Sequence, residues 1–485
     1  MDLQFPKTRH TWLAAASHCK ELEQTLELKL PDNMPDIGKV VCAWGQSLLR
    51  SKQWNRDGAG VSGGVMVWVM YLPEDGSEAR CVEGWLPFQA RWEVADKERD
   101  GVIVASCYLS GVDGRSLSAR KLMVRANVAL AADTFVETEA QISSPGELPE
   151  DVQLKLEDLQ LRLPVEAGEK TVELDETILP PAGVKPDKLL SYSLHPRVTD
   201  CKLMADRAVF RGTAQGHGLY LGEDGQLHSW DFQVPFSQYG DLDREYGAED
   251  RLQVTMVLTG LEMELTPEGG ARLKGSMQGQ YVLWQQRKMQ LVTDAYSTKN
   301  ETQLQQMPLE LPRVTAFIND GVTASAGGVK GTEKALEWSF FPVCPAIILG
   351  EEGLQAELAG SFQALGMEDG SLTSQIIPWQ GSVPLPPGQQ GSLRLCLSGP
   401  VDSQAELSLE GWLMDMLEVP MVTGIAVNEP LERRDDRPSM ILRRAGEDLL
   451  WDIAKANATT VEKIMEANAL TQEPQGKSWL LIPMP

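Results

Sequence analysis

The chain has 485 residues, a length that predicts about three to four domains, because a single hydrophobic core rarely grows beyond roughly 250–300 residues. It carries 69 acidic and 44 basic side chains, which gives a formal net charge of −25. This charge argues against nucleic acid and anionic lipid surfaces as partners, since both require a basic face.

The chain shows no targeting or membrane segment. Its N-terminus lacks a basic stretch followed by an apolar run, and no apolar segment is long enough to cross a bilayer, so we expect neither a signal peptide nor a membrane span. The cysteines are odd in number, scattered, and never form a Cys-x-x-Cys pair, so we expect buried free thiols in a reducing compartment. They are Cys19, Cys42, Cys81, Cys107, Cys201, Cys344 and Cys396.

Three sequence elements recur in the same order along residues 1 to 430. Each series has an Asp-Gly hairpin signal, then an apolar-Pro-apolar strand element, then a strand that ends in Leu, a hydroxyl residue and Gly. The members are Asp75-Gly76, Asp224-Gly225 and Asp369-Gly370; Leu86 to Phe88, Val234 to Phe236 and Val383 to Leu385; and Leu109 to Gly111, Leu258 to Gly260 and Leu397 to Gly399. We therefore predict three copies of one domain, at residues 1–145, 146–300 and 301–430, the third degenerate.

The copies are predicted to be β-structured, because apolar and polar residues alternate. The alternation is clearest from Leu252 to Leu258 and from Ala271 to Leu283, and it returns in the third copy from Ala405 to Glu410. A period of two places the apolar set on one face, which needs a second sheet to cover it. The expected fold class is mainly β: three antiparallel β-sandwich or barrel-like repeats and a small βααβ module. Candidate linkers are Ser143 to Asp151, Thr298 to Met307 and Asn428 to Ser439.

Some residue patterns match catalytic or nucleotide-binding motifs, but their predicted structural context does not fit those motifs. Gly58 to Gly63 matches the dinucleotide fingerprint G-x-G-x-x-G, but a strand-like run follows where a helix should begin, so we expect a hairpin loop. Gly327 to Thr332 has phosphate-loop composition without the spacing, and we expect another loop. His18 and Cys19 are adjacent, but neighbours on a helix point about 100° apart, so we expect no catalytic couple. We expect no enzyme activity, no cofactor and no metal.

The last 46 residues, from Met440 to Pro485, have the pattern of a strand-helix-helix-strand module. Met440 to Leu442 predicts the first strand, and Leu480 to Ile482 the return strand. Leu450, Ile453 and Ala454 share one helical face, and so do Val461, Ile464 and Met465. Thr459 or Thr460 is placed to cap the second helix, with Glu462 in its first turn. This order resembles a LysM domain, which we place at residues 437–485 and call the C-terminal module; Trp451 is assigned to its core.

The LysM resemblance implies a binding groove. LysM domains bind N-acetylglucosamine polymers between the loop after the first strand and the loop after the second helix, which are residues 446–449 and 468–472 here. The first loop is one residue longer than usual and lacks its hydroxyl residue, so the groove serves either a glycan or a protein partner. The contact residues that the resemblance implies are Asp448, Leu449, Asn468 and Leu470 in the loops, with Lys455 and Trp479 beside them.

A second resemblance comes from the first two copies, which share a Leu-Pro pair followed by Pro-Asp and two apolar residues. The first version, residues 30–37, resembles the opening of the SPOCS domain of Firmicute sporulation proteins. The third copy lacks a clear counterpart near Leu311-Pro312. SPOCS-like copies followed by a LysM domain resemble the SipL family of clostridial coat morphogenesis proteins.

This family resemblance implies a non-catalytic scaffold of the spore coat, in the mother-cell cytoplasm at the forespore surface. The LysM domain would tether it to a SpoIVA-like coat ATPase, and the SPOCS-like copies would recruit other coat proteins. One alternative is a glycan-binding protein that reads peptidoglycan in the cortex or wall. Another is a cell-wall hydrolase that uses LysM for targeting, which requires a pair of catalytic carboxylates or a metal cluster in the first 430 residues.

Overall fold

The computed structural model describes residues 2–56, 58–94, 99–180, 183–327, 335–351, 353–368, 371–431, 438–445, 448–473 and 478–484. Antiparallel strands make up almost all of this part of the chain, and α-helix occurs in it only near the C-terminus. The predicted fold class, mainly β, is confirmed. Among the described residues, no helix is long and apolar enough to cross a bilayer.

Strands β2 to β20 fall into three strand sets with the same order: a long strand, a meander of shorter strands, and a hairpin whose second strand pairs with the long one. The first set contains β2 (Lys7–Lys29), β3 (Ile37–Asn55), β4 (Gly58–Pro73), β5 (Arg80–Trp92), β6 (Gly101–Ser118) and β7 (Lys121–Ser143). The second contains β8 (Val152–Ile178), β9 (Pro186–Met204), β10 (Arg207–Gly222), β11 (Leu227–Asp241), β12 (Arg251–Leu265) and β13 (Ala271–Ser297). The third contains β14 (Asn300–Ser325), β15 (Ala335–Pro342), β16 (Ala346–Gly350), β17 (Gly353–Glu368), β18 (Ser371–Pro384), β19 (Gln390–Val401) and β20 (Gln404–Pro430). A short β1 (Asp2–Gln4) pairs with β20.

Each strand set folds as a two-layer sandwich. The meander forms one sheet, in the order β3-β4-β5 for the first set, and the long strand and hairpin form the other, in the order β2-β7-β6. Apolar side chains from both sheets meet between them, such as Val67 and Phe88 opposite Leu122 and Val128. In the third set, β15 and β16 both pair with the same side of β17, so together they take the place of β3. The period-two alternation predicted for Ala271 to Leu283 is the buried face of β13.

The recurring motifs have two structural roles. Asp75-Gly76 and Asp224-Gly225 lie in the turns between the second and third meander strands, where Gly76 and Gly225 have φ of 76° and 72°. Asp369-Gly370 lies outside the described residues. The Leu-Ser/Thr-Gly motifs were predicted to end their strands, but they mark one-residue β-bulges in β6 and β12 and a longer break in the pairing of β19, between Leu397 and Val401. A bulge leaves one residue unpaired and bends the strand, and the strand continues beyond it.

Two predictions on local structure were wrong. Gly58 to Gly63 is not a hairpin loop but the start of strand β4. Glycine occurs there because the chain is crowded: a Cβ on Gly63 would lie 2.1 Å from the Leu48 carbonyl oxygen. Thr298 to Met307 is not a linker, because β14 begins at Asn300. The predicted loop after Gly327 and most of the third predicted linker lie outside the described residues, although Asn428 to Pro430 belong to β20.

The His18–Cys19 pair and the Leu-Pro elements also differ in structure from what the sequence predicted. His18 and Cys19 lie on strand β2 and not on a helix, so they point to opposite faces of the sheet. Leu311-Pro312 lies inside strand β14. In the first two sets the Leu-Pro residues instead lie in the connection from the long strand to the meander, and the Pro-Asp residues lie where the meander begins, just before β3 and at the start of β9. The corresponding connection of the third set runs between Ser325 and Ala335, which explains why no counterpart occurs near Leu311.

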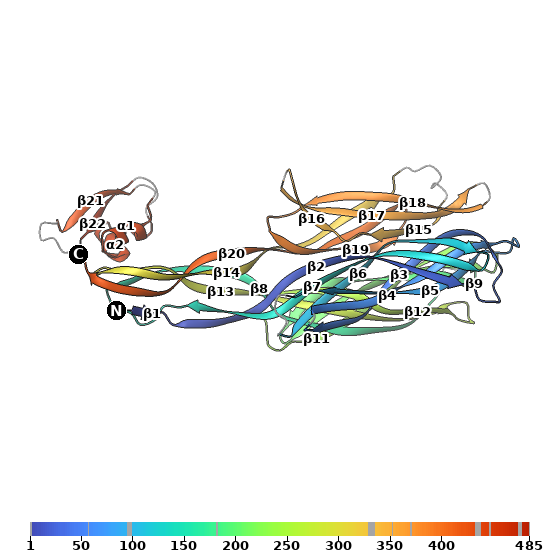
Figure 1. Ribbon diagram of the computed structural model, residues 1–485, viewed down its shortest axis with the longest axis horizontal. Helices are drawn as coiled ribbons and strands as arrows, with labels where there is room; N and C mark the ends of the chain where they lie inside the picture. Colours follow the sequence, from blue (N-terminus) through green and yellow to red (C-terminus); the bar gives the residue numbers. More distant parts are fainter. Residues whose placement is uncertain are drawn as a thin grey trace.

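The long strands extend beyond the sandwiches and pack together in a shared stem (Figure 1). Each set contributes its long strand and the hairpin strand paired with it: β2 with β7, β8 with β13, and β14 with β20. Where the stem meets the sandwiches, Phe135, Trp284 and Trp412 come together from the three sets, with ring centroids 6.2 and 5.6 Å apart. Further out, the stem core is formed by Trp12, Ile142, Leu159, Leu161, Leu163, Met289, Leu291, Leu309, Leu311, Val419 and Met421.

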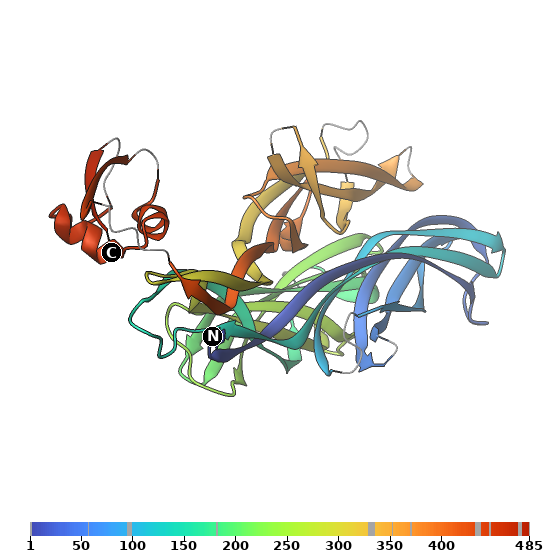
Figure 2. The same cartoon turned by 60° about the vertical axis from the view of Figure 1, so that its left-hand side comes forward.

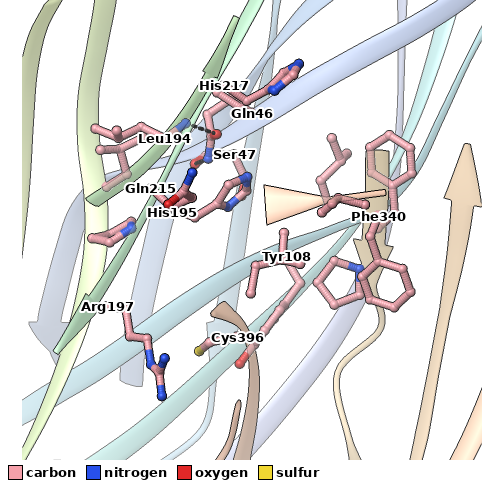
Figure 3. A pocket seen from close by; sticks show the side chains of 18 of the residues that line it. Gln46, Ser47, Tyr108, Leu194, His195, Arg197, Gln215, His217, Phe340 and Cys396 are labelled. Atoms are coloured by element: carbon pink, nitrogen blue, oxygen red, sulfur yellow. Dashed lines mark hydrogen bonds between the residues drawn. The ribbon is translucent and has the colours of Figure 1, made fainter. Parts of the chain in front are cut away.

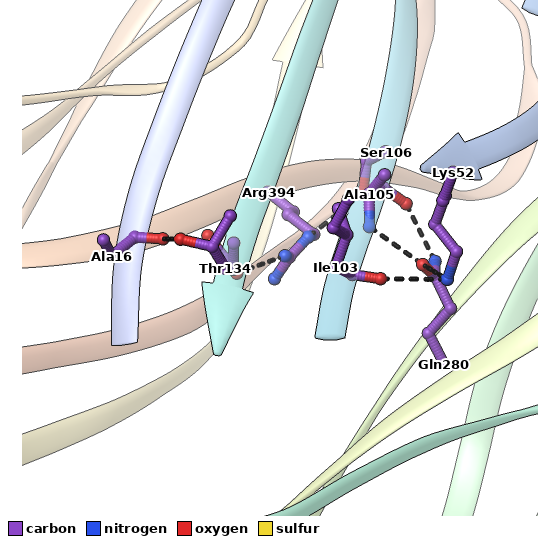
Figure 4. A network of polar contacts seen from close by, with 9 residues as sticks. Ala16, Lys52, Ile103, Ala105, Ser106, Thr134, Gln280 and Arg394 are labelled. Atoms are coloured by element: carbon purple, nitrogen blue, oxygen red, sulfur yellow. Dashed lines mark hydrogen bonds and ion pairs between the residues drawn. The ribbon is translucent and has the colours of Figure 1, made fainter. Parts of the chain in front are cut away.

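Buried polar side chains connect the first strand set to the other two (Figure 4). The Gln280 side-chain amide of β13 accepts from the Ala105 N–H and donates to the Ala105 carbonyl, both at 2.8 Å. Lys52 donates to Gln280 and to the Ile103 carbonyl, both at 2.9 Å. Arg394 of the third set pairs with Asp133 of the first, and both side chains are buried. These buried donors, acceptors and charges find their partners only when the strand sets are packed together. They therefore stabilise one relative orientation of the sandwiches.

The C-terminal module has the predicted order of elements: β21 (Met440–Ala445), α1 (Leu450–Ala456), α2 (Val461–Ala467) and β22 (Ser478–Pro483). Its core contains the predicted helix positions Leu450, Ile453, Ala454 and Ile464, together with Leu480 and Ile482. Figures 1 and 2 place the module at the free end of the stem, near the N-terminus.

Candidate functional site

The helices of the C-terminal module are held by local hydrogen bonds. Thr460, one of the two predicted capping residues, accepts from the Lys463 N–H at 3.2 Å, and Glu462 lies in the first turn of α2. At the other end of α2, Asn468 donates to the Ile464 carbonyl at 2.8 Å. These caps satisfy backbone groups that a helix leaves unpaired, which matters in helices of seven residues each.

Strands β21 and β22 form a two-stranded antiparallel sheet, although both helices lie between them in the sequence. The outer face of this strand pair is apolar and exposed. Residues directly opposite in an antiparallel pair share a face, and the ladder pairs Leu442 with Leu481 and Arg444 with Trp479. Met440, Leu442, Leu481 and Trp479 are 51, 59, 40 and 64% exposed. We call these four residues with Arg444 the hairpin face. Four large apolar side chains together on so small a module are typical of an interaction surface.

Two of the residues named from the LysM resemblance lie at the start of α1. Asp448 forms an ion pair with Arg443 at 2.8 Å, which is exposed to solvent. Leu449 is the N-cap residue of α1, and its side chain is 47% exposed. Leu449 is therefore free to contact a partner, whereas Asp448 already has one.

The other two loop residues serve the module itself. The Asn468 side chain bonds both backbone groups of Leu481, donating to the carbonyl at 2.6 Å and accepting from the N–H at 2.7 Å. It thereby ties the end of α2 to strand β22, directly behind the hairpin face. Leu470 is half-buried and packs on the module core. Their role as contact residues stays a prediction.

Lys455 and Trp451 face the rest of the protein, strands β1 to β20, which we call the body. Trp451 Nε1 donates to Asp294 Oδ2 at 2.7 Å, and Lys455 Nζ lies 2.7 Å from Asp294 Oδ1. The Tyr296 hydroxyl donates to the Thr459 carbonyl at 2.7 Å, and its ring lies 5.0 Å from that of Trp451. Trp451 packs on the module core, as predicted, but only partly, and its other side covers Tyr296 of β13. The module is thus docked on the stem through Asp294 and Tyr296.

Sequence reasoning named Trp479 but missed the rest of the hairpin face. Strand alternation separates Met440, Leu442 and Leu481 from Ile441, Leu480 and Ile482, but both sets are apolar, so only the folded module shows which face points to solvent. Asp294 and Tyr296 carried no signal, because their partners lie more than 150 positions away in the chain.

A cavity of about 200 Å³ lies where the three strand sets meet (Figure 3). Its walls include Tyr108 from the first set, His195 and His217 from the second, and Phe340 and Cys396 from the third. His217 Nδ1 bonds Asp231 at 2.7 Å, and its Nε2 lies 2.6 Å from Glu337 Oε1 without hydrogen-bond alignment. His217 therefore joins the second and third sets by an ion pair.

The titratable groups of this cavity are fixed in their charge states. Burial alone would lower the pKa of His217, but the hydrogen bond to Asp231 and the close negative charges of Glu337 and Asp231 outweigh burial and raise the pKa to about 10. Burial and the nearby charge of His217 lower the pKa of His195 to about 4. At neutral pH, His217 is therefore a cation and His195 a neutral imidazole.

The cavity thiols are poor nucleophiles. Burial raises the pKa of Cys107 to about 11 and that of Cys396 to about 12, so both stay protonated. The Ser47 hydroxyl donates to the Cys107 carbonyl at 3.1 Å, which directs its proton away from either histidine. Among the described residues, no group of three or more His, Cys, Asp or Glu side chains is placed to hold a metal ion.

The second strand set contains a segment that is similar to a known protein family. Residues 185–266 match the family model described as SipL, SPOCS domain. This segment runs from the start of β9 to the end of β12 in the second strand set. The similarity to SipL is therefore confirmed for this segment, and it suggests a protein related to sporulation. No curated protein and no solved structure matches the chain. The domain boundaries, the first and third SPOCS copies and the LysM domain stay predictions.

Proposed function

We propose that this chain is a non-catalytic scaffold in spore coat assembly, and that its C-terminal module tethers it to a SpoIVA-like coat ATPase at the forespore surface, in the mother-cell cytoplasm. Two observations support the proposal. The SPOCS match in the second strand set relates the chain to SipL, and the exposed hairpin face gives the module a surface for a partner.

The chemistry of the hairpin face favours a protein partner over a glycan. Met440, Leu442 and Leu481 offer aliphatic surface and no hydrogen-bonding side chain, whereas sugar hydroxyls need polar partners. Arg and aromatic residues such as Arg444 and Trp479 are enriched at the centres of protein interfaces. The module has six basic and six acidic side chains in residues 437–485 and carries no formal net charge. It can therefore approach a partner that the strongly acidic body would repel.

The body supports a scaffold role. Its three sandwiches share one stem and are connected by buried polar pairs, so partners bound on different sandwiches would be held at fixed spacing. In the central cavity the thiols are held protonated and His217 is held in an ion pair, which favours a structural function for these groups. Recruitment of other coat proteins by the sandwiches belongs to the same proposal.

The direct test is binding of the purified full-length chain to a purified SpoIVA-like ATPase. Leu442→Glu places a charge in the middle of the hairpin face and should weaken binding at least tenfold, because a buried interface charge without a partner is costly. Leu349→Glu is the matched control, since Leu349 on β16 is 82% exposed and lies on the body. Equal affinity for wild type and Leu442→Glu would contradict the proposal.

The same preparation distinguishes the alternatives. N-acetylglucosamine oligomers titrated into the full-length chain should give no saturable signal, and saturation would favour the glycan-binding alternative. Zymography on peptidoglycan should show no clearing, and a cleared band would favour a hydrolase.

A further inference from the structure

Cys19 lies on an accessible face of the first sandwich. It stands in strand β2 directly opposite Ala131 of β7, so the two side chains share one face of the sheet. Ala129, two residues away on β7, points to the same face. The cysteine is exposed, which corrects the prediction of a buried thiol there; Cys201 is exposed as well.

Cys344 reaches the same face from the third strand set. It lies in the short connection that separates β15 from β16. Its side chain packs against Ala129 and Ala131, together with Tyr108 of the neighbouring strand β6. Ala131 is the cross-strand neighbour of Cys19, so the two cysteines meet over the same alanine, near enough for each thiol to shift the pKa of the other.

We propose that Cys19 and Cys344 are a modification site, at which a small-molecule disulfide such as glutathione disulfide is reduced and a covalent bridge forms between the first and third strand sets. The Cys19 thiolate attacks one sulfur of glutathione disulfide, and one glutathione leaves as a thiolate. Cys344 then attacks the Cys19 sulfur and displaces the second glutathione. Two protein thiols lose two electrons and two protons, and the glutathione disulfide takes them up and becomes two molecules of reduced glutathione.

The environments of the two thiols favour this order of attack. The contact with Cys344 is the main reason why the pKa of Cys19 is lowered, so Cys19 is the better nucleophile. The pKa of Cys344 is raised mainly by the same contact and by burial. Once Cys19 is in a mixed disulfide it carries no charge, so that part of the barrier to Cys344 ionisation disappears.

Neither the couple Cys42 and Cys81 nor the exposed Cys201 offers an equivalent pair. Cys42 and Cys81 lie on either side of Met70 on neighbouring strands, so they are two strand spacings apart, or about 10 Å. A disulfide needs Cα atoms within about 7 Å, so these two cannot bond without moving a strand. Exposed Cys201 donates to the Leu252 carbonyl and has no thiol partner among the described residues.

The bridge would close a loop between two parts of the chain that are far apart in sequence. Long loops gain the most from a cross-link, because the unfolded chain loses the most freedom. The oxidised protein should therefore melt several degrees above the reduced protein, and the first and third sandwiches should no longer separate when the stem is destabilised.

The test uses the full-length chain incubated with glutathione disulfide, followed by peptide mapping without reduction. We expect one peptide pair joined through Cys19 and Cys344, with a mass lower by two hydrogens than the sum of the free peptides. Cys19→Ser and Cys344→Ser should each abolish this pair and the rise in Tm, and Cys201→Ser should leave both unchanged. A glutathione adduct that stays on Cys19 while Cys344 remains a free thiol would overturn the proposal.

Discussion

Asp294 is the residue on which docking of the C-terminal module depends. It accepts from Trp451 and pairs with Lys455, and its side chain is only 20% exposed. We expect Asp294→Asn to weaken docking by about 1–2 kcal/mol, a value reduced for the 40% exposure of Lys455. Hydrogen exchange of the α1 amides should then speed up while the body is unaffected. Asp175→Asn, which breaks an exposed pair with Arg272, is the control and should leave α1 unchanged.

A double-mutant cycle tests the pairing itself. If Asp294 and Lys455 act through each other, Asp294→Asn combined with Lys455→Met should cost less than the sum of the single changes. Strictly additive effects would show that the ion pair contributes nothing to docking.

His217 predicts a pH dependence of stability. Its pKa rises from 6.5 to about 10 on folding, so the folded protein binds the proton more tightly than the unfolded chain. The resulting stabilisation is complete below pH 6.5 and is lost as pH rises from 6.5 through 10. Urea unfolding at several pH values should show this loss in the wild type, and His217→Gln should have a flatter profile over that range. Parallel profiles for the two proteins would contradict the assignment.

Arg394 holds a buried carboxylate of another strand set. Its side chain is 3% exposed and Asp133 is 1% exposed. Arg394→Met leaves Asp133 buried without its cation, which typically costs about 3–5 kcal/mol. We expect the midpoint of urea unfolding to fall accordingly, and a second change, Asp133→Asn, to restore part of the loss. A single change without effect would contradict a stabilising ion pair between the two strand sets.

At the scale of elements, the crowded glycines of β4 can be tested directly. Gly63→Ala places a methyl group 2.1 Å from the Leu48 carbonyl oxygen, so the neighbouring strand has to move, and we expect a loss of about 1–3 kcal/mol. Gly321→Ala on β14 is the matched control, because a Cβ there meets nothing within 4 Å. Equal stability of the two variants in thermal unfolding would contradict the explanation that crowding in β4 requires glycine at position 63.

Sequence patterns predicted the elements well where alternation was strong. The buried face of β13, the Asp-Gly turns of the first two strand sets and the four elements of the C-terminal module all follow from local pattern and turn chemistry. Helix geometry was wrong for His18 and Cys19 in strand β2, where alanines, leucines, glutamates and lysines favour helix locally. Pairing along its whole length with β7 overrides that preference. The Leu-Ser/Thr-Gly motifs were found but were interpreted as strand ends, since a bulge has no signature that separates it from a turn.

At the scale of the whole molecule, the sequence predicted a repeated domain, but it did not predict how the three strand sets pack against one another. The pairs Gln280–Ala105 and Arg394–Asp133 join residues more than 170 positions apart, and the shared stem joins strands of three different sets. No local pattern encodes such contacts. The candidate site was predictable in part. Trp479 came from the family resemblance, whereas Met440, Leu442 and Leu481 required knowing which face of the hairpin is inward, and the docking residue Asp294 required the folded chain.

The location of the full-length protein in sporulating cells tests the central claim most directly. A fluorescent fusion of the wild type should encircle the forespore, because the hairpin face holds the scaffold to its coat partner. The Leu442→Glu fusion should spread through the mother-cell cytoplasm at equal abundance, while the Leu349→Glu control should behave as the wild type. A Leu442→Glu fusion that still encircles the forespore would contradict the account and place the attachment on the sandwiches.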